Sequence, residues 1–246
     1  MKEFTLISIL QFLALSGMLS QHNQVQEIID NSIQYHGGER FNEAHFSYDF
    51  RKHHYEYHYD HGDFRYERHH KDAPIIDILD NNGFSRLNNG KKVKLSEKDS
   101  QNYANSVNSV RYFAFLPFFL NDAAVNKEYL GLESIKDRSY HKIKIWFDQE
   151  GGGKDFEDIY VYWFDTSDYS MDYLAYSFHV NDGGVRFREA YNARMVDGIL
   201  FQDYVNFKHE KETPVTELGK LYQDSALTEL SRIELENVKS LPRGDR

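Results

Sequence analysis

The sequence predicts an α+β fold in which a curved antiparallel sheet follows an N-terminal helix and is covered by an inserted aromatic helix. Apolar residues recur at helical spacing from Gln24 to His36, and the apolar period changes to two beyond Gly37-Gly38. Turn signals such as Asn81-Asn82-Gly83 then separate short strands about ten residues apart, which is typical of an antiparallel meander. Several late strands are apolar on both faces, which indicates a sheet covered by helices or curved around a groove.

The first strands are predicted from the alternation of apolar and polar residues. Residues 44–50 alternate in this way, so that one face of the strand is apolar. The apolar residues of this strand occupy even positions, whereas the tyrosines that follow occupy the odd positions 55, 57 and 59. We therefore expect a bulge or bend near Lys52–His54.

An aromatic helix is predicted to begin at Ser96, where Asp99 three residues later resembles a capping box. It runs into the apolar segment 112–120, YFAFLPFFL, in which Pro117 should kink or end the helix. This segment is too apolar all round for a surface helix. Two alternatives follow: the segment fills the sheet as core, or it is a movable lid over a lipid groove.

The second half of the chain is predicted to be mostly strand. The apolar pattern places strands at residues 128–134, 140–147, 159–165, 173–179, 185–194 and 199–207, then a helix at 218–227 and a last strand at 233–238. No linker-like segment divides the chain, so we expect a single domain over residues 21–246.

Composition excludes several classes of protein. The 246 residues carry a formal charge of −10 and no basic block, which argues against nucleic-acid binding. Cysteine is absent, so disulfides, thiol nucleophiles and thiolate metal sites are excluded.

Residues 1–20 are predicted to be a signal peptide, because Lys2 precedes an apolar stretch too short for a membrane span. Leu15-Ser16-Gly17 resembles a bacterial lipoprotein processing box, but Met18 stands where that box requires cysteine. We therefore expect a secreted or periplasmic protein whose signal is cleaved and which is not lipidated.

A family resemblance agrees with these elements. The segments Asn108–Leu120, Tyr160–Phe164 (YVYWF) and Gly183–Asn192 (GGVRFREAYN) resemble an uncharacterised family of secreted bacterial proteins over roughly residues 25–210. The whole pattern is similar to the outer-membrane lipoprotein carrier fold, a half-barrel sheet with helices on its concave face. Arg68 is followed by His69 where carriers often have proline, so the resemblance assigns Arg68 no carrier role. It implies a binding protein for an apolar small molecule or acyl chain, in transient contact with the outer membrane or a lipoprotein.

Eight residues are predicted to line the ligand site because they carry the apolar or ligand-pairing side chains of the aromatic segment and the late strands. They are Tyr112, Phe115, Leu116, Phe119, Trp146, Trp163, Tyr176 and Arg188. An inward-facing arginine could hold a ligand carboxylate or phosphate, and the alternative is a solvated strand face or an internal ion pair.

A histidine-rich stretch invites a metal interpretation. On a strand, His54, Glu56, His58 and Asp60 share one face, and two imidazoles there could hold Zn²⁺ or Ni²⁺, with His69-His70 on the next strand in reach. That face is expected to be solvated and to lack buried groups that would orient the ligands, so adventitious binding is favoured over a specific site. The acidic loop around the three glycines at 151–153 lacks EF-hand spacing, so no metal or cofactor is assigned.

No catalytic motif supports an enzyme. The G-x-S-x-G, H-E-x-x-H, P-loop and G-x-G-x-x-G strings do not occur. A binding protein is favoured, and the alternatives are a structural or interaction protein with a filled groove and, third, a hydrolase that uses carboxylates and histidine.

Overall fold

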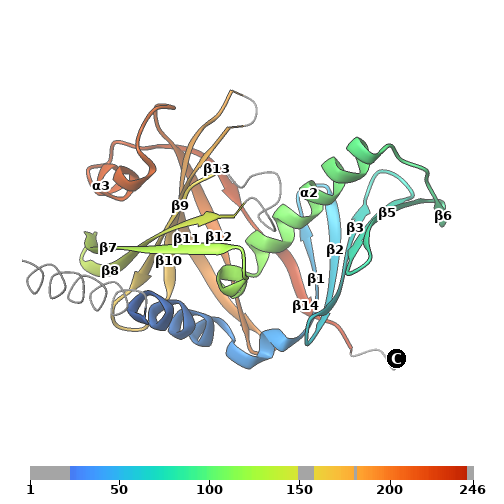
Figure 1. Cartoon of the computed structure of the whole chain (residues 1–246), viewed down its shortest axis with the longest axis horizontal. Helices are drawn as coiled ribbons and strands as arrows, with labels where there is room; N and C mark the ends of the chain where they lie inside the picture. The colour runs from blue at the N-terminus through green and yellow to red at the C-terminus, as the bar shows by residue number, and fades with distance from the viewer. Residues whose placement is uncertain (1–22, 149–157, 180–181, 243–246) are drawn as a thin grey trace, which may run out of the picture. The chain divides into compact units, whose positions relative to one another are not determined.

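The computed structural model describes residues 23–148, 158–179 and 182–242 (Figure 1). The expected signal peptide and the three-glycine loop lie outside the described residues. The chain forms two compact units. The first comprises Met1–Ser32, Ala123–Arg188 and Phe207–Thr228, and the second comprises Ile33–Asp122, Glu189–Asn206 and Glu229–Arg246. The expectation of a single domain over 21–246 stays a prediction.

Two seven-stranded sheets account for most of the fold. Their antiparallel pairing is the one that the sequence predicted, whereas the division into two sheets was not predicted. The first sheet has the order β14-β1-β2-β3-β4-β5-β6. Its strands are β1 Glu43–Phe50, β2 His53–Asp60, β3 Asp63–His70, β4 Ile75–Asp80, β5 Gly83–Asn88, β6 Lys91–Lys92 and β14 Glu236–Ser240.

The change of parity after β1 arises from a tight hairpin rather than from a bulge. Phe50 pairs with His53, so the chain reverses over Arg51 and Lys52. Arg51 has a φ of 55°, the left-handed conformation that such short turns require. The reversal brings Tyr48 opposite Tyr55 and Phe46 opposite Tyr57, so the tyrosine row joins the apolar face of β1.

Helix α2, Glu97–Ala114, covers that apolar face and packs against β3, β4 and β5. The predicted N-terminus is confirmed, since the Ser96 hydroxyl accepts a hydrogen bond of 3.1 Å from the Asp99 backbone N–H. The helix ends at Ala114, before Pro117, and a short 3₁₀ turn follows at Phe118–Asn121. The aromatic segment is therefore mostly outside the regular helix.

A buried ionic network lies on the same face of the sheet as α2. The Asp77 carboxylate, which is fully buried, accepts hydrogen bonds from Arg68, Arg86 and His70 at 2.6–3.0 Å. Arg68 also donates to the Ser106 hydroxyl of α2 at 2.9 Å. Arg68 is thus paired within the second unit.

The second sheet has the order β13-β12-β11-β10-β9-β8-β7. Its strands are β7 Val125–Ile135, β8 Arg138–Phe147, β9 Tyr160–Asp165, β10 Met171–Phe178, β11 Gly184–Val196, β12 Ile199–Lys208 and β13 Thr228–Ile233. The last strand expected at 233–238 is instead two strands in different sheets, β13 and β14, because the chain crosses from one sheet to the other between Ile233 and Glu236.

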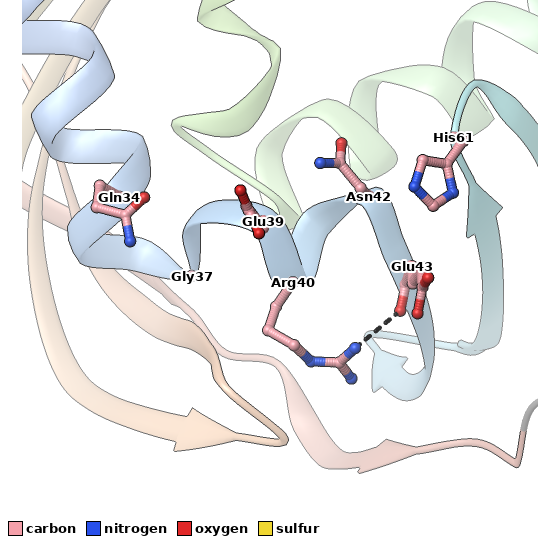
Figure 2. A pocket seen from close by; sticks show the side chains of 7 residues that line it. All are labelled: Gln34, Gly37, Glu39, Arg40, Asn42, Glu43 and His61. Carbon is pink, nitrogen blue, oxygen red and sulfur yellow. Dashed lines mark hydrogen bonds between the residues drawn. The ribbon is translucent and has the colours of Figure 1, made fainter.

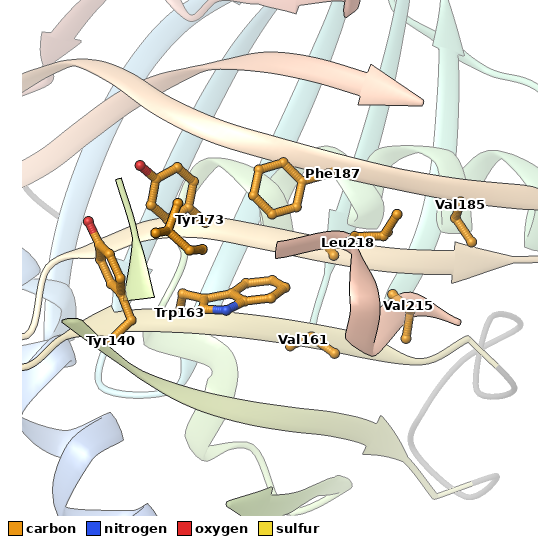
Figure 3. Close-up of a cluster of buried hydrophobic side chains, with 10 residues drawn as sticks. Tyr140, Val161, Trp163, Tyr173, Val185, Phe187, Val215 and Leu218 are labelled. Atoms are coloured by element: carbon orange, nitrogen blue, oxygen red, sulfur yellow. The ribbon is translucent and has the colours of Figure 1, made fainter. Parts of the chain in front are cut away.

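In the first unit, one face of this sheet is closed by α3, Leu218–Gln223, and the 3₁₀ turn before it, Val215–Glu217 (Figure 3). Trp163 lies at the centre of this cluster and is fully buried. A Cβ on Gly219 would lie 2.7 Å from the Trp163 ring, so only glycine lets α3 approach this closely. The helix is shorter than the predicted 218–227.

The N-terminal helix, residues 23–36, is present as predicted. Val25, Ile28 and Ile29 are buried. In the first unit the helix meets β7, where the Lys127 ammonium group donates to the Gln26 side-chain oxygen at 2.9 Å. Lys127 pairs with Ile145, so the helix lies on the opposite face of the sheet from Trp163.

Candidate ligand-binding site

A row of aromatic side chains lies on the face of the second sheet that is turned away from Trp163. We call Phe147, Tyr160, Tyr176 and Phe178 the aromatic row. Tyr160 and Tyr176 are register partners on β9 and β10, and their rings stack with centroids 5.6 Å apart. The ring centroids of Phe147 and Tyr160 are 5.7 Å apart in an edge-on arrangement, and those of Tyr176 and Phe178 are 6.1 Å apart. All four rings are half-buried, so part of each is exposed to solvent.

Two arginines of β11 border the aromatic row. The Arg188 guanidinium donates to the Tyr176 hydroxyl at 3.0 Å and lies 5.0 Å from the centre of that ring. The Arg186 guanidinium lies 4.8 Å from the Phe178 ring and donates to the Val185 carbonyl at 2.8 Å. The stacking on aromatic rings holds both planar cations at one end of an apolar surface. Such a cation can hold a carboxylate or phosphate through two parallel hydrogen bonds.

The structure brings together two of the four predicted site residues of the first unit. Tyr176 and Arg188 are in direct contact. Trp163 lies on the other face within the closed cluster under α3. Trp146 shares the face of Lys144, whose ammonium group lies 5.2 Å from the indole, and is therefore also turned away from the aromatic row.

Sequence reasoning missed Phe147, Phe178 and Arg186 as site residues. The two-residue period of β10 could have placed Phe178 beside Tyr176. Nothing in the local pattern, however, indicates which residues of β8 and β11 lie beside them, because that depends on strand register.

The other four predicted residues lie in the second unit, where they form core. Phe115, Leu116 and Phe119 are 1%, 7% and 4% exposed. Half-buried Tyr112 stacks on Phe119 with centroids 5.1 Å apart and donates its hydroxyl hydrogen to the Phe119 carbonyl at 2.9 Å. This closed packing is that of a core segment and favours the first of the two alternatives over a lid.

A surface pocket of about 780 Å³ is also present in the second unit, around the 3₁₀ turn Gly38–Asn42 (Figure 2). Arg40 donates to the Glu43 carbonyl at 3.4 Å and forms an ion pair of 2.6 Å with Asp197. The lining is polar, which suits water or a polar solute and does not suit an acyl chain. The residues that line the pocket are Gln34, Gly37, Glu39, Arg40, Asn42, Glu43 and His61.

Two antiparallel sheets with few helices make this an α+β protein. The structure is similar to a LolA superfamily protein from Nitrosomonas europaea, with a TM-score of 0.50 and 10% identity over 89% of this chain and 94% of that one. The likeness confirms the fold expected from the resemblance to lipoprotein carriers. A DUF1329 family protein from Desulfovibrio piger has a TM-score of 0.48 and 8% identity, over 88% of this chain and 92% of that one.

Residues 2–235 match the model of DUF6503, a family of unknown function, and the chain belongs to that family. No curated protein is detectably similar in sequence. Within the described part of the chain, none of the helices is both long enough and apolar enough to cross a membrane.

Proposed function

We propose that this protein is an exported carrier-type binding protein that holds a lipid or other apolar ligand on the aromatic row. The observation that carries the proposal is the placement of four half-buried rings and two guanidinium groups on one face of one sheet. The ligand that suits both parts is an amphiphile with an acyl chain and an acidic head group. Export is supported by the signal-like pattern of residues 1–20.

The energetics favour an apolar chain on this surface. Each methylene that leaves water gains about 0.8 kcal/mol, so a chain of ten methylenes gains about 8 kcal/mol before the costs of ordering are subtracted. Aromatic rings that are exposed on one side lose little of their own packing when a chain covers them. The apolar part of the ligand therefore supplies most of the affinity.

The head group is expected to lie beside Arg186 and Arg188. Hydrogen bonds between a guanidinium and a carboxylate or phosphate are about twice as strong as neutral ones. Because the Tyr176 hydroxyl accepts a hydrogen bond from Arg188, the guanidinium already has a fixed position and loses little rotamer freedom on binding. The arginines therefore supply selectivity for an acid over an alcohol of the same chain length.

The second candidate function is a structural or interaction role, because part of the predicted ligand site is already filled by the protein's own side chains. Phe115, Leu116 and Phe119 fill the core of the second unit, so these three predicted site residues offer no open surface to a ligand. This observation moves the proposed site from the aromatic segment to the first unit.

The test is titration of the purified full chain with a fluorescent fatty acid, together with mass spectrometry of lipids extracted from the native protein. Binding is expected in the micromolar range, and Tyr160→Ala and Tyr176→Ala are each expected to weaken it about tenfold, equivalent to 1.4 kcal/mol. Leu132→Ala is the matched control, since Leu132 is a 63% exposed apolar residue on the same sheet. An empty extract and no probe binding would overturn the proposal, as would equal binding by all three variants.

The role of Arg188 in selecting an acidic head group is tested by a separate measurement. Arg188→Met keeps an unbranched side chain of similar length and removes the charge. The variant is expected to bind the fatty acid and the matching fatty alcohol equally, whereas the natural chain should prefer the acid. If the natural chain binds both equally, the head group does not lie at Arg188.

A further inference from the structure

The face of the first sheet that is turned away from α2 carries four metal-type donor side chains in one patch. His54 and Glu56 come from β2, and Glu67 and His69 come from β3. The register pairs Glu56 directly with Glu67 and His54 directly with His69. Directly opposed residues on antiparallel strands have their Cβ atoms about 5 Å apart, so the four side chains form a square.

Distances within the square are close to those of a metal site. One donor atom each from Glu56, Glu67 and His69 lies within 4.8 Å of the others. The His69 Nε2 atom is 2.9 Å from a Glu67 carboxylate oxygen. Around a tetrahedral zinc ion with bonds of about 2.0 Å, neighbouring ligand atoms lie about 3.3 Å apart. Because the observed donor atoms lie within 4.8 Å of one another, the half-buried side chains would have to rotate inward to close around an ion.

The fourth corner is His54, which is oriented by a carboxylate. Its Nδ1 atom is 2.8 Å from an Asp49 oxygen, and its Nε2 atom is 3.7 Å from a Glu56 oxygen. Asp49 itself accepts hydrogen bonds from Asn237 at 2.8 Å and lies 3.3 Å from the Lys71 ammonium group. Metal-binding histidines commonly donate their other ring N–H to a carboxylate in this manner.

Protonation states agree with this orientation. The Asp49 carboxylate is surrounded by three donors, which are Asn237, His54 and Lys71. An ionised carboxylate only accepts hydrogen bonds, so His54 donates from Nδ1 and leaves Nε2 for a ligand.

The two opposed glutamates also favour a cation between them. Like charges directly opposite on neighbouring strands destabilise a sheet. Arg65 holds one Glu67 oxygen at 2.6 Å, and the other oxygen faces His69.

We propose that Glu56, Glu67 and His69, completed by His54, bind a divalent transition-metal ion, with Zn²⁺ as the best match. Imidazole nitrogens suit Zn²⁺, Ni²⁺ and Cu²⁺ and do not suit Ca²⁺ or Mg²⁺, which prefer oxygen ligands. The sequence already placed His54 and Glu56 on one face, and β3 adds the two donors that complete the set. His70, in contrast, points to the other face and bonds to Asp77.

The test is titration of metal-free, tag-free full chain with Zn²⁺ against a chromophoric chelator, and with Co²⁺ followed by visible absorption. We expect one ion per chain and a dissociation constant in the micromolar range. Glu67→Gln and His69→Ala should each weaken binding at least tenfold while far-ultraviolet circular dichroism is unchanged.

The matched controls are His45→Ala and His58→Ala. These two histidines lie on the same face and their Nδ1 atoms are 3.1 Å apart, so they offer a rival pair of donors. Both controls should keep the affinity within about twofold. Loss of binding in the controls but not in Glu67→Gln would overturn the proposal, as would absence of Zn²⁺ binding by the natural chain. Neither result bears on the aromatic row, which lies in the other unit.

Discussion

Replacing Phe115 by alanine distinguishes a core segment from a lid. The ring is 1% exposed and lies against four other aromatic rings of the second unit. Its centroid is 4.4 Å from that of Tyr57, 5.8 Å from Phe201, 6.2 Å from Tyr48 and 6.4 Å from Phe46. These partners come from β1, β2 and β12, so the ring joins the β1–β2 hairpin to a strand that is distant in sequence.

The expected loss of unfolding free energy is about 4–5 kcal/mol. Removing a buried phenylalanine side chain costs about 3–5 kcal/mol through lost burial and the cavity that remains. Aromatic pairs with favourable geometry contribute about 0.5–1.5 kcal/mol more, which places Phe115 in the upper part of that range. Phe113, on α2, is half-buried, and its ring centroid lies 5.7 Å from that of Phe50 and 5.6 Å from that of Tyr204, so Phe113→Ala should cost about 2 kcal/mol.

Urea unfolding provides the measurement. Both tryptophans, Trp146 and Trp163, lie in the first unit, so their fluorescence follows that unit while far-ultraviolet circular dichroism follows both. We expect Phe115→Ala to lower the circular dichroism midpoint strongly and the control to lower it modestly. A loss below about 1 kcal/mol, combined with weaker binding of a fatty-acid probe, would refute the core assignment and restore the lid.

The remaining predictions concern buried polar groups and close packing. Asp77→Asn should cost about 3–5 kcal/mol, because it leaves the Arg68 charge buried without its carboxylate. Burial raises the pKa of Asp77, but Arg86, His70 and Arg68 outweigh burial and lower it to about 2, so its stabilising contribution should be complete above about pH 4 and lost between pH 4 and pH 2. Gly219→Ala should cost about 1–3 kcal/mol, because the added methyl group meets the rigid Trp163 ring. Ser96→Ala should cost about 1 kcal/mol through the lost cap of α2.

Each of these predictions has a direct check by urea unfolding at fixed pH. For Asp77, the acid-sensitive part of stability between pH 4 and pH 2 should shrink in Asp77→Asn, and an unchanged pH profile would contradict the assignment. For Gly219, a neutral or stabilising alanine would mean that α3 can move away from Trp163. For Ser96, Ser96→Asp should retain the cap and its stability, and equal losses in both variants would argue against capping.

Predictions from sequence succeeded where the information is local. The start of α2 at Ser96 follows from one hydroxyl and one nearby amide, and the end of the helix before Pro117 follows from proline geometry. The same locality explains the confirmed helix at residues 23–36 and the alternation in β1. The sequence predicted a bulge or bend near Lys52–His54, and it could not tell either from the hairpin turn that the structure has after Phe50, because each of these features moves the apolar residues from even to odd positions.

The candidate sites could be predicted only in part. Tyr176 and Arg188 were named from residue type, but their contact depends on how β10 lies beside β11. Trp163 was named for the same reason and proved to be core, since nothing in a strand that is apolar on both faces indicates which row α3 will cover.

The sequence by itself determined the α+β class, most of the elements and which residues share a face of each strand, because helical and strand periods are properties of adjacent residues. Only the tertiary structure decided that Glu56 faces Glu67, that Phe147 stands beside Tyr160, and that the aromatic segment is core. The physical reason is that strand register and helix docking are set by turns and by packing between residues distant in sequence. A shift of one residue in register would turn every side chain of a strand to the opposite face.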